Sequence, residues 1–131
     1  MNCTNCQSPE RKLWVLFGPH PKPTLTDAES GNWTWLQRCE QCGALWCLSR
    51  YEPYASFPYV VLWPSDRAAW RRVSVRDAGE SLGRWHASMV REHLQCLPAA
   101  ELAQVEAHRR RSYGRNPIDE PETLQTADLL A

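Results

Sequence analysis

Two pairs of cysteines offer the clearest chemistry in this sequence of 131 residues. Cys3 and Cys6 are separated by two residues, and so are Cys39 and Cys42. A CxxC turn directs both sulfurs to one side, and backbone N–H groups after its first cysteine donate to the thiolates. Two such turns brought together supply four thiolates in a tetrahedron, the geometry that structural zinc prefers. We therefore predict one structural Zn²⁺ ion bound by these four cysteines, with no open position for catalysis.

Gly43 directly follows the second pair, where a residue without a side chain relieves crowding at the tight end of the turn. The pattern CTNC…CEQCG resembles the zinc-ribbon class over residues 1–52. In that class two such turns clamp zinc at the end of a three-stranded sheet, and the resemblance assigns the same four cysteines as ligands. Gln7 departs from the pattern, because many ribbons have glycine after the first pair. Rubredoxin-like electron carriers, which hold iron with four thiolates, are a further alternative against which Gln7 also counts.

The cysteines outside the pairs carry a weaker signal. Cys47 and Cys96 are single, and single cysteines are commonly buried as small apolar residues, so we predict both in the core. His86, His93 and Cys96 share one side of a predicted helix, but no acidic residue stands where it would orient an imidazole. No Gly-rich phosphate loop and no recognisable pair of carboxylates accompanies them. We predict that the protein is not an enzyme.

Four short stretches rich in β-branched and aromatic residues predict strands that position the cysteines. They cover residues 12–18, 32–39, 44–52 and 57–63. The segment 18–32 contains three prolines and a polar, acidic run, so we predict a long loop there. Both CxxC turns would then lie at one end of a mostly antiparallel sheet.

Helical periodicity dominates the second half of the chain. Ser65 is predicted to cap a short helix that ends near residue 72. Apolar residues recur every three or four positions from Asp77 to about Leu97, which predicts a longer helix with one buried stripe. A further helix is predicted over residues 98–112.

These elements predict an α+β fold. It consists of a zinc-ribbon-like antiparallel sheet of three to four strands with two or three C-terminal helices packed on its open face. The length suits a single domain, which we place at residues 1–112. Residues 113–131 are polar with few apolar positions, and we predict a flexible tail that is mobile or ordered by a partner.

The net charge and the first residues of the chain indicate which partners and which cellular compartment to expect. Fifteen basic and fifteen acidic residues cancel, which removes the broad positive field that nucleic-acid binders use against phosphates. The first residues lack the pattern of a secretory signal, and no stretch has the roughly 20 apolar residues needed to cross a membrane. We predict a cytoplasmic protein, in which thiols stay reduced and bind metal.

Seven tryptophans are an excess for so short a chain. Most are predicted to fill the core, while one or two anchor an interface. In general character the chain resembles small bacterial toxin-immunity proteins, which implies a protein that neutralises a toxin by filling a cationic cleft. The residues predicted to bind this partner are Asp27, Glu29, Trp33, Trp35, Asp119, Glu120 and Glu122.

A zinc-ribbon protein that binds nucleic acid or acts in transcription is the main alternative. The predicted helices carry a mild excess of arginine. These arginines could simply face solvent, or they could bind an acidic protein, RNA or DNA. The neutral overall charge favours protein over nucleic acid.

Overall fold

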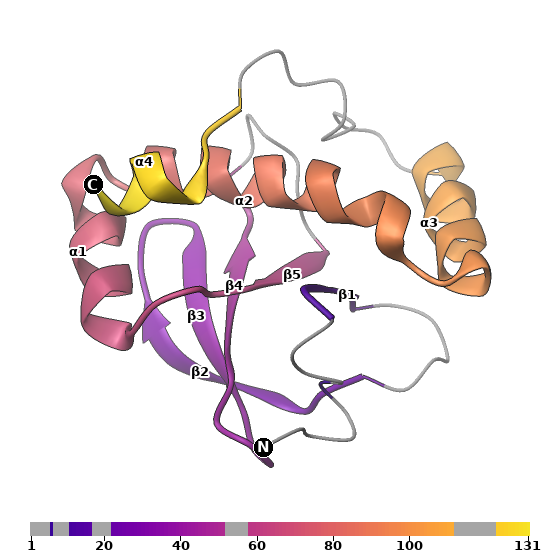
Figure 1. Cartoon of the computed structure of the whole chain (residues 1–131), viewed down its shortest axis with the longest axis horizontal. Helices are drawn as coiled ribbons and strands as arrows, with labels where there is room; N and C mark the ends of the chain where they lie inside the picture. Colours follow the sequence, from indigo (N-terminus) through magenta and orange to yellow (C-terminus); the bar gives the residue numbers. More distant parts are fainter. Residues whose placement is uncertain (1–5, 7–10, 17–21, 52–57, 112–122) are drawn as a thin grey trace.

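A five-stranded antiparallel sheet forms the centre of the protein (Figure 1). The computed structural model describes residues 6, 11–16, 22–51, 58–111 and 123–131. The strand order is β1-β5-β4-β3-β2, and every neighbouring pair is antiparallel. The predicted α+β class is confirmed, with five strands in place of three to four. The strands are β1 (Leu13–Val15), β2 (Leu25–Ser30), β3 (Thr34–Cys39), β4 (Leu45–Ser49) and β5 (Tyr59–Leu62).

Both faces of the sheet bury apolar side chains, because neighbouring residues of a strand point to opposite faces. In β4, Cys47 belongs to the cluster on one face, whereas Trp46 and Leu48 belong to the cluster on the other. β5 repeats the pattern with Val61 and Val60. This produces two apolar layers, of which the first also contains the buried residues of the helices.

The helices follow the sheet in the sequence and supply the first layer. α2 runs along the sheet (Figure 1) and contributes Leu82, Trp85 and Val90 to that layer. Trp85 meets Trp63 edge to face, with ring centroids 5.3 Å apart. No helix among the described residues is long and apolar enough to cross a membrane. The helical elements are α1 (Arg67–Arg76), α2 (Glu80–His93), a 3₁₀ turn (Leu94–Cys96), α3 (Ala99–Arg111) and α4 (Thr126–Leu130).

The start of α1 differs by one residue from the prediction. Asp66, not Ser65, is the N-cap, and its Oδ1 accepts a hydrogen bond of 2.8 Å from the backbone N–H of Ala69. A carboxylate at this position also interacts favourably with the positive end of the helix dipole, which stabilises the helix. α1 then continues to Arg76, beyond the predicted end near residue 72.

The prediction of a loop over 18–32 is wrong for residues 25–30, which form β2. Asp27 stands opposite Gln37 of β3, and a bulge follows between Asp27 and Glu29. β2 is an edge strand with mostly polar residues, so it lacks the apolar alternation on which the prediction depended. Arg67 of α1 donates a hydrogen bond of 2.7 Å to the backbone oxygen of Ala28. This side chain thereby supplies a partner for one backbone group of the edge strand.

The prediction of a flexible tail is wrong for the end of the chain. Residues 126–130 form α4, and Leu129 is fully buried in the first layer. The indole N–H of Trp85 donates to Thr126 Oγ1 at 3.0 Å. The backbone N–H of Leu124 donates to Ser88 Oγ at 2.9 Å. The buried Leu129, the partly buried Leu124 and Leu130, and these hydrogen bonds therefore hold the segment against α2 and the first layer.

An ion pair joins the beginning of the described chain to α3. Both oxygens of the Glu101 carboxylate bind the Arg11 guanidinium, and both side chains are about nine-tenths buried. The Arg11 guanidinium also lies over the ring of Trp14, 3.8 Å from its centroid. The two-point contact and the stacking both require a planar guanidinium, so lysine is a poor substitute for Arg11.

Gly79 is expected to tolerate no side chain. Its φ of +88° is in the left-handed region, and a Cβ would lie 2.6 Å from the backbone oxygen of Asn32. Gly79→Ala should lower the free energy of unfolding by about 1–2 kcal/mol for the backbone conformation alone, and further through the clash. Urea unfolding followed by tryptophan fluorescence measures the loss. Ala78→Gly, which relaxes the neighbouring φ of +57°, should leave stability equal or higher, and an equal loss in both variants would contradict this account.

Candidate metal centre

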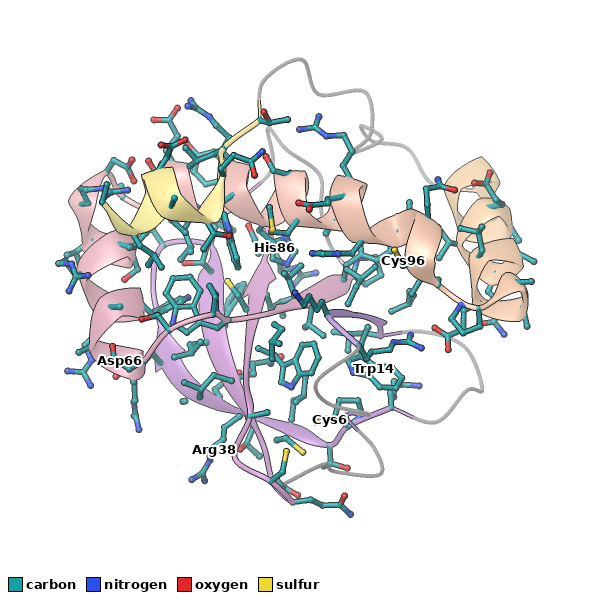
Figure 2. All side chains as sticks on the ribbon, in the orientation of Figure 1. Cys6, Trp14, Arg38, Asp66, His86 and Cys96 are labelled. Carbon is teal, nitrogen blue, oxygen red and sulfur yellow. The ribbon has the colours of Figure 1, made fainter. Side chains whose placement is uncertain are left out.

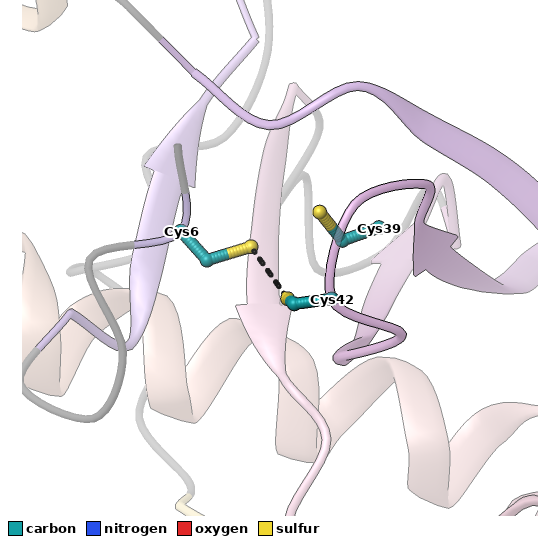
Figure 3. A group of neighbouring side chains, drawn as sticks. All are labelled: Cys6, Cys39 and Cys42. Atoms are coloured by element: carbon teal, nitrogen blue, oxygen red, sulfur yellow. Dashed lines mark hydrogen bonds between the residues drawn. The ribbon is translucent and has the colours of Figure 1, made fainter. Parts of the chain in front are cut away.

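Three of the four predicted zinc ligands meet at one end of the sheet (Figure 3). Cys39 ends β3, Cys42 lies in the turn before β4, and Cys6 approaches from the start of the chain. The three sulfurs lie within 4.8 Å of one another, and Cys42 Sγ is 3.7 Å from Cys6 Sγ. Four sulfurs about 2.3 Å from a zinc ion define a tetrahedron with edges of about 3.8 Å. The Cys6–Cys42 spacing fits such an edge and is far longer than a disulfide bond of about 2.05 Å.

The turn from Cys39 to Gly43 has the local structure that presents two sulfurs together. The N–H of Gly43 donates to the backbone oxygen of Cys39 at 2.9 Å, and the N–H of Cys39 donates to that of Ala44 at 2.9 Å. Gly43 has a φ of +77°, and no atom lies within 4 Å of the position of a Cβ. Glycine is favoured here by the backbone conformation and not by a lack of space.

The protonation of the three thiols reflects their crowding. Burial raises the pKa of Cys6, and the neighbouring thiols of Cys39 and Cys42 raise it further. The pKa of Cys39 is lowered to about 7, because hydrogen bonds from the N–H groups of Cys42 and Gln41 and from the other two thiols outweigh the effect of burial. The turn therefore stabilises a thiolate at its first cysteine, as a metal-binding turn does.

The second apolar layer surrounds this group of thiols. Cys6 and Cys39 are buried, and they belong to the same cluster as Trp14, Trp46 and Val60 on the sheet face opposite the helices. Figure 2 shows Cys6 and Trp14 at this part of the sheet. A metal bound here would be shielded from water and would extend the second layer to the end of the sheet.

The remaining cysteines have different surroundings. Cys3, the fourth predicted ligand, lies outside the described residues. Cys47 is fully buried, as predicted, and burial raises its pKa to about 12. Cys96 is exposed at the end of the 3₁₀ turn (Figure 2), so its assignment to the core was wrong. His93 is half-buried, whereas Cys96, three residues later in the 3₁₀ turn, is exposed.

His86 of α2 is fully buried beneath β4. Its Nε2 lies 3.0 Å from the backbone oxygen of Cys47. Burial lowers its pKa to about 4, although the backbone oxygens of Cys47 and Tyr59 act in the opposite direction. Its hydrogen bond to the sheet gives His86 a structural role between helix and strands, as expected for a histidine on a helical stripe.

His86 is expected to make stability depend on pH. Its folded-state pKa of about 4 lies below the ordinary value of 6.5, so between these values the unfolded chain takes up a proton that the folded chain does not. The free energy of unfolding should fall by about 3 kcal/mol as the pH drops from 6.5 to 4. His86→Gln keeps a donor for the sheet but does not titrate. Urea unfolding of both proteins across this range should show the steeper loss in the wild type; identical profiles would contradict the assignment.

The acidic residues of β2, predicted to bind a partner, form contacts within the protein. Asp27 Oδ1 accepts a hydrogen bond of 3.0 Å from Gln37 Nε2. Glu29 Oε1 lies 2.9 Å from Arg67 Nε and 2.6 Å from Arg71 Nε. The hydrogen bonds from Arg67 and Arg71 lower the pKa of Glu29. The charge of Glu29 is therefore already compensated by α1.

The tryptophans predicted to bind a partner have unequal exposure. Trp33 is 66% exposed in the turn between β2 and β3. Trp35 is half-buried and packs against the second apolar layer. The other three predicted partner residues, Asp119, Glu120 and Glu122, lie outside the described residues.

Cys6, Cys39 and Cys42 are the one group of three or more metal-binding side chains within the described part of the chain. This group is therefore the clearest indication of function in the described part of the chain. No protein-family model, no curated protein and no solved structure matches this chain.

Proposed function

We propose that the protein is a non-enzymatic, zinc-stabilised module that binds another protein. The observation that carries the proposal is the convergence of Cys6 with Cys39 and Cys42 at the spacing of a zinc–thiolate tetrahedron. Cys3, from the first CxxC pair, supplies the fourth thiolate in this proposal. Because four thiolates leave zinc no open position, the ion stabilises the fold and takes part in no reaction.

The zinc ion would connect segments that are distant in the sequence. Cys6 comes from the start of the chain, whereas Cys39 and Cys42 belong to the β3–β4 turn. A chain that must close such a loop loses conformational entropy, and a bound metal offsets that loss. The beginning of the chain is thereby fixed against the second apolar layer, so the sheet surface keeps one shape for recognition.

Binding of a protein is supported by the position of Trp33. An exposed tryptophan in a tight turn contributes little to the fold, and tryptophan is the residue most enriched among the energetic anchors of protein interfaces. Neutralisation of a bacterial toxin is the specific form of this role that we propose. Co-expression with a toxin encoded beside its gene should restore growth, and lack of protection against every such toxin would remove this specific form.

The wider proposal is tested by purifying the tagged protein from its native cells. We expect one zinc ion per chain and one co-purifying protein in a one-to-one complex that survives moderate salt. A red, iron-containing protein would favour the electron-carrier alternative. Salt-sensitive recovery of RNA or DNA would favour the nucleic-acid alternative. A metal-free protein with no stoichiometric partner would overturn the proposal.

A further inference from the structure

The turn between β2 and β3 packs directly against the end of α1 and the residues that follow it (Figure 1). A Cβ at Gly31 would lie 3.2 Å from Ser74 Cβ and 3.3 Å from the ring of Trp70. A Cβ at Gly79 would lie 2.6 Å from the backbone oxygen of Asn32. These close approaches place the tip of the hairpin and the C-terminal part of α1 on one continuous surface.

This surface carries both of the large apolar side chains that are exposed in the described part of the chain. Trp33 is 66% exposed, and Val75 is 76% exposed. Trp33 follows Asn32 in the hairpin turn, and Val75 follows Ser74 near the end of α1, so the two exposed residues belong to the two segments that meet here. Exposed apolar groups that gather on one surface indicate an interaction site more strongly than the same groups scattered singly.

The backbone at Trp33 is unfavourable for a large residue. Gly31 N–H donates to the oxygen of Thr34 at 2.8 Å and closes a turn with Asn32 and Trp33 at its centre. Trp33 has a φ of +61°, a value that favours glycine or asparagine at this position of a turn. The fold thus gains neither burial nor backbone stability from a tryptophan here. Strained residues with this profile concentrate at functional sites.

Exposed arginines lie next to both apolar residues. Arg72 is exposed on α1, three positions before Val75 and therefore on the same side of the helix. The side chain of Arg50 is also exposed, and its backbone N–H donates to the oxygen of Trp33 at 2.7 Å. Arginine and tryptophan are the residues most enriched among interface hot spots.

The acidic residues that follow α1 are engaged locally. Asp77 accepts hydrogen bonds from the backbone N–H and the hydroxyl of Ser81. Glu80 Oε1 lies 3.1 Å from Arg84 Nη2. The charge of Arg76 contributes to lowering the pKa of Asp77, so Arg76 is already partly compensated. An approaching partner therefore meets the exposed Arg72 on α1 and the exposed Arg50 beside Trp33.

We propose that Trp33, Val75, Arg50 and Arg72 form a docking site for an acidic protein segment that places an apolar side chain against the Trp33 ring. We call this surface the hairpin–helix patch. The proposal rests on the proposed protein-binding function and names its surface and the charge of the partner. That charge is opposite to the cationic cleft expected from the sequence. An aliphatic residue beside the tryptophan and a neutral overall charge favour protein over nucleic acid.

The test is selection from a displayed library of random peptides, about a dozen residues long, with the full-length zinc-loaded protein as bait. Enriched peptides should be acidic and carry at least one large apolar residue. Trp33→Gly should weaken their binding about 30-fold or more, the loss expected for a hot-spot residue. Arg72→Glu should weaken it about threefold to tenfold, as for a charge at the rim. The thermal midpoint of Trp33→Gly should equal or exceed that of the wild type, since the substitution removes an exposed ring and relaxes the turn.

Ala78→Gly is the matched control, because it relaxes a neighbouring left-handed residue, with a φ of +57°, and keeps the tryptophan. Its binding should stay within about twofold of the wild type. No enrichment, basic or purely polar peptides, or competition by a single-stranded oligothymidylate would overturn the proposal. Acidic peptides that bind Trp33→Gly as well as the wild type would also overturn the hairpin–helix patch, while leaving the protein-binding function to its own test in native cells.

Discussion

Replacing Cys39 by serine is expected to abolish zinc binding and to lower the free energy of unfolding by about 4 kcal/mol, the stabilisation provided by a ligand present at 1,000 times its dissociation constant. Cys39 is buried, and its sulfur lies within 4.8 Å of those of Cys6 and Cys42. A serine hydroxyl stays protonated at neutral pH and is a poor ligand for zinc. Zinc content per chain and urea unfolding measure the two effects. Chelation of the wild-type protein should cause a similar loss of stability.

Cys96→Ser is the matched control for this prediction. It makes the same change of sulfur to oxygen at an exposed cysteine that lies outside the thiol group. We expect Cys96→Ser to keep one zinc ion per chain and wild-type stability. If Cys39→Ser retained its zinc and its unfolding midpoint, the centre would contribute nothing to the fold. If both variants lost zinc equally, the ligand assignment would be wrong.

Leu129→Ala is expected to lower the free energy of unfolding by about 2–5 kcal/mol, the range for truncation of a fully buried leucine. Leu129 lies within the first apolar layer and is the buried residue of α4. α4 spans only five residues, too few for a stable helix on its own, so its packing is what keeps it helical. Loss of the leucine should therefore release the whole segment, and unfolding in urea, together with proteolysis at the C-terminal end, should detect both effects.

Removal of residues 123–131 should cost more than Leu129→Ala. The truncation also leaves Trp85 Nε1 and Ser88 Oγ without the partners they have on Thr126 and Leu124. Leu130→Ala offers the comparison, since Leu130 is only partly buried, and a smaller loss is expected. Stability that is unchanged by Leu129→Ala, or lost equally in both leucine variants, would contradict the packing of α4.

Most of the candidate metal centre could be predicted from the local sequence around its cysteines. The spacing of Cys39 and Cys42 and the glycine after them describe a local turn, and local turns depend on few other residues. Cys6 joins that turn because β1, the strand that follows it, begins at the same end of the sheet. The strands β3, β4 and β5 were predictable for a related reason, since their alternation of large apolar residues marks two buried faces.

The remaining features depend on contacts that a single sequence does not display. No side chain of β2 is fully buried, so its backbone pairing with β3 has no apolar signature in the sequence. α4 is held chiefly by Leu129, in a helix of only five residues whose apolar positions are too few to form a helical stripe. The ion pairs of Glu29 could not be predicted, because its two arginines follow about 40 residues later, on a helix whose approach to β2 only the fold reveals.

X-ray absorption at the zinc edge of the purified protein tests the central claim most directly. We expect one zinc ion per chain surrounded by four sulfur atoms at about 2.3 Å, with no light-atom ligand in the first coordination sphere. The Cys39→Ser protein is expected to contain no zinc and to give no such signal. A protein without zinc, or zinc bound mainly by nitrogen and oxygen, would contradict a four-thiolate centre and with it the account of this protein as a zinc-stabilised scaffold.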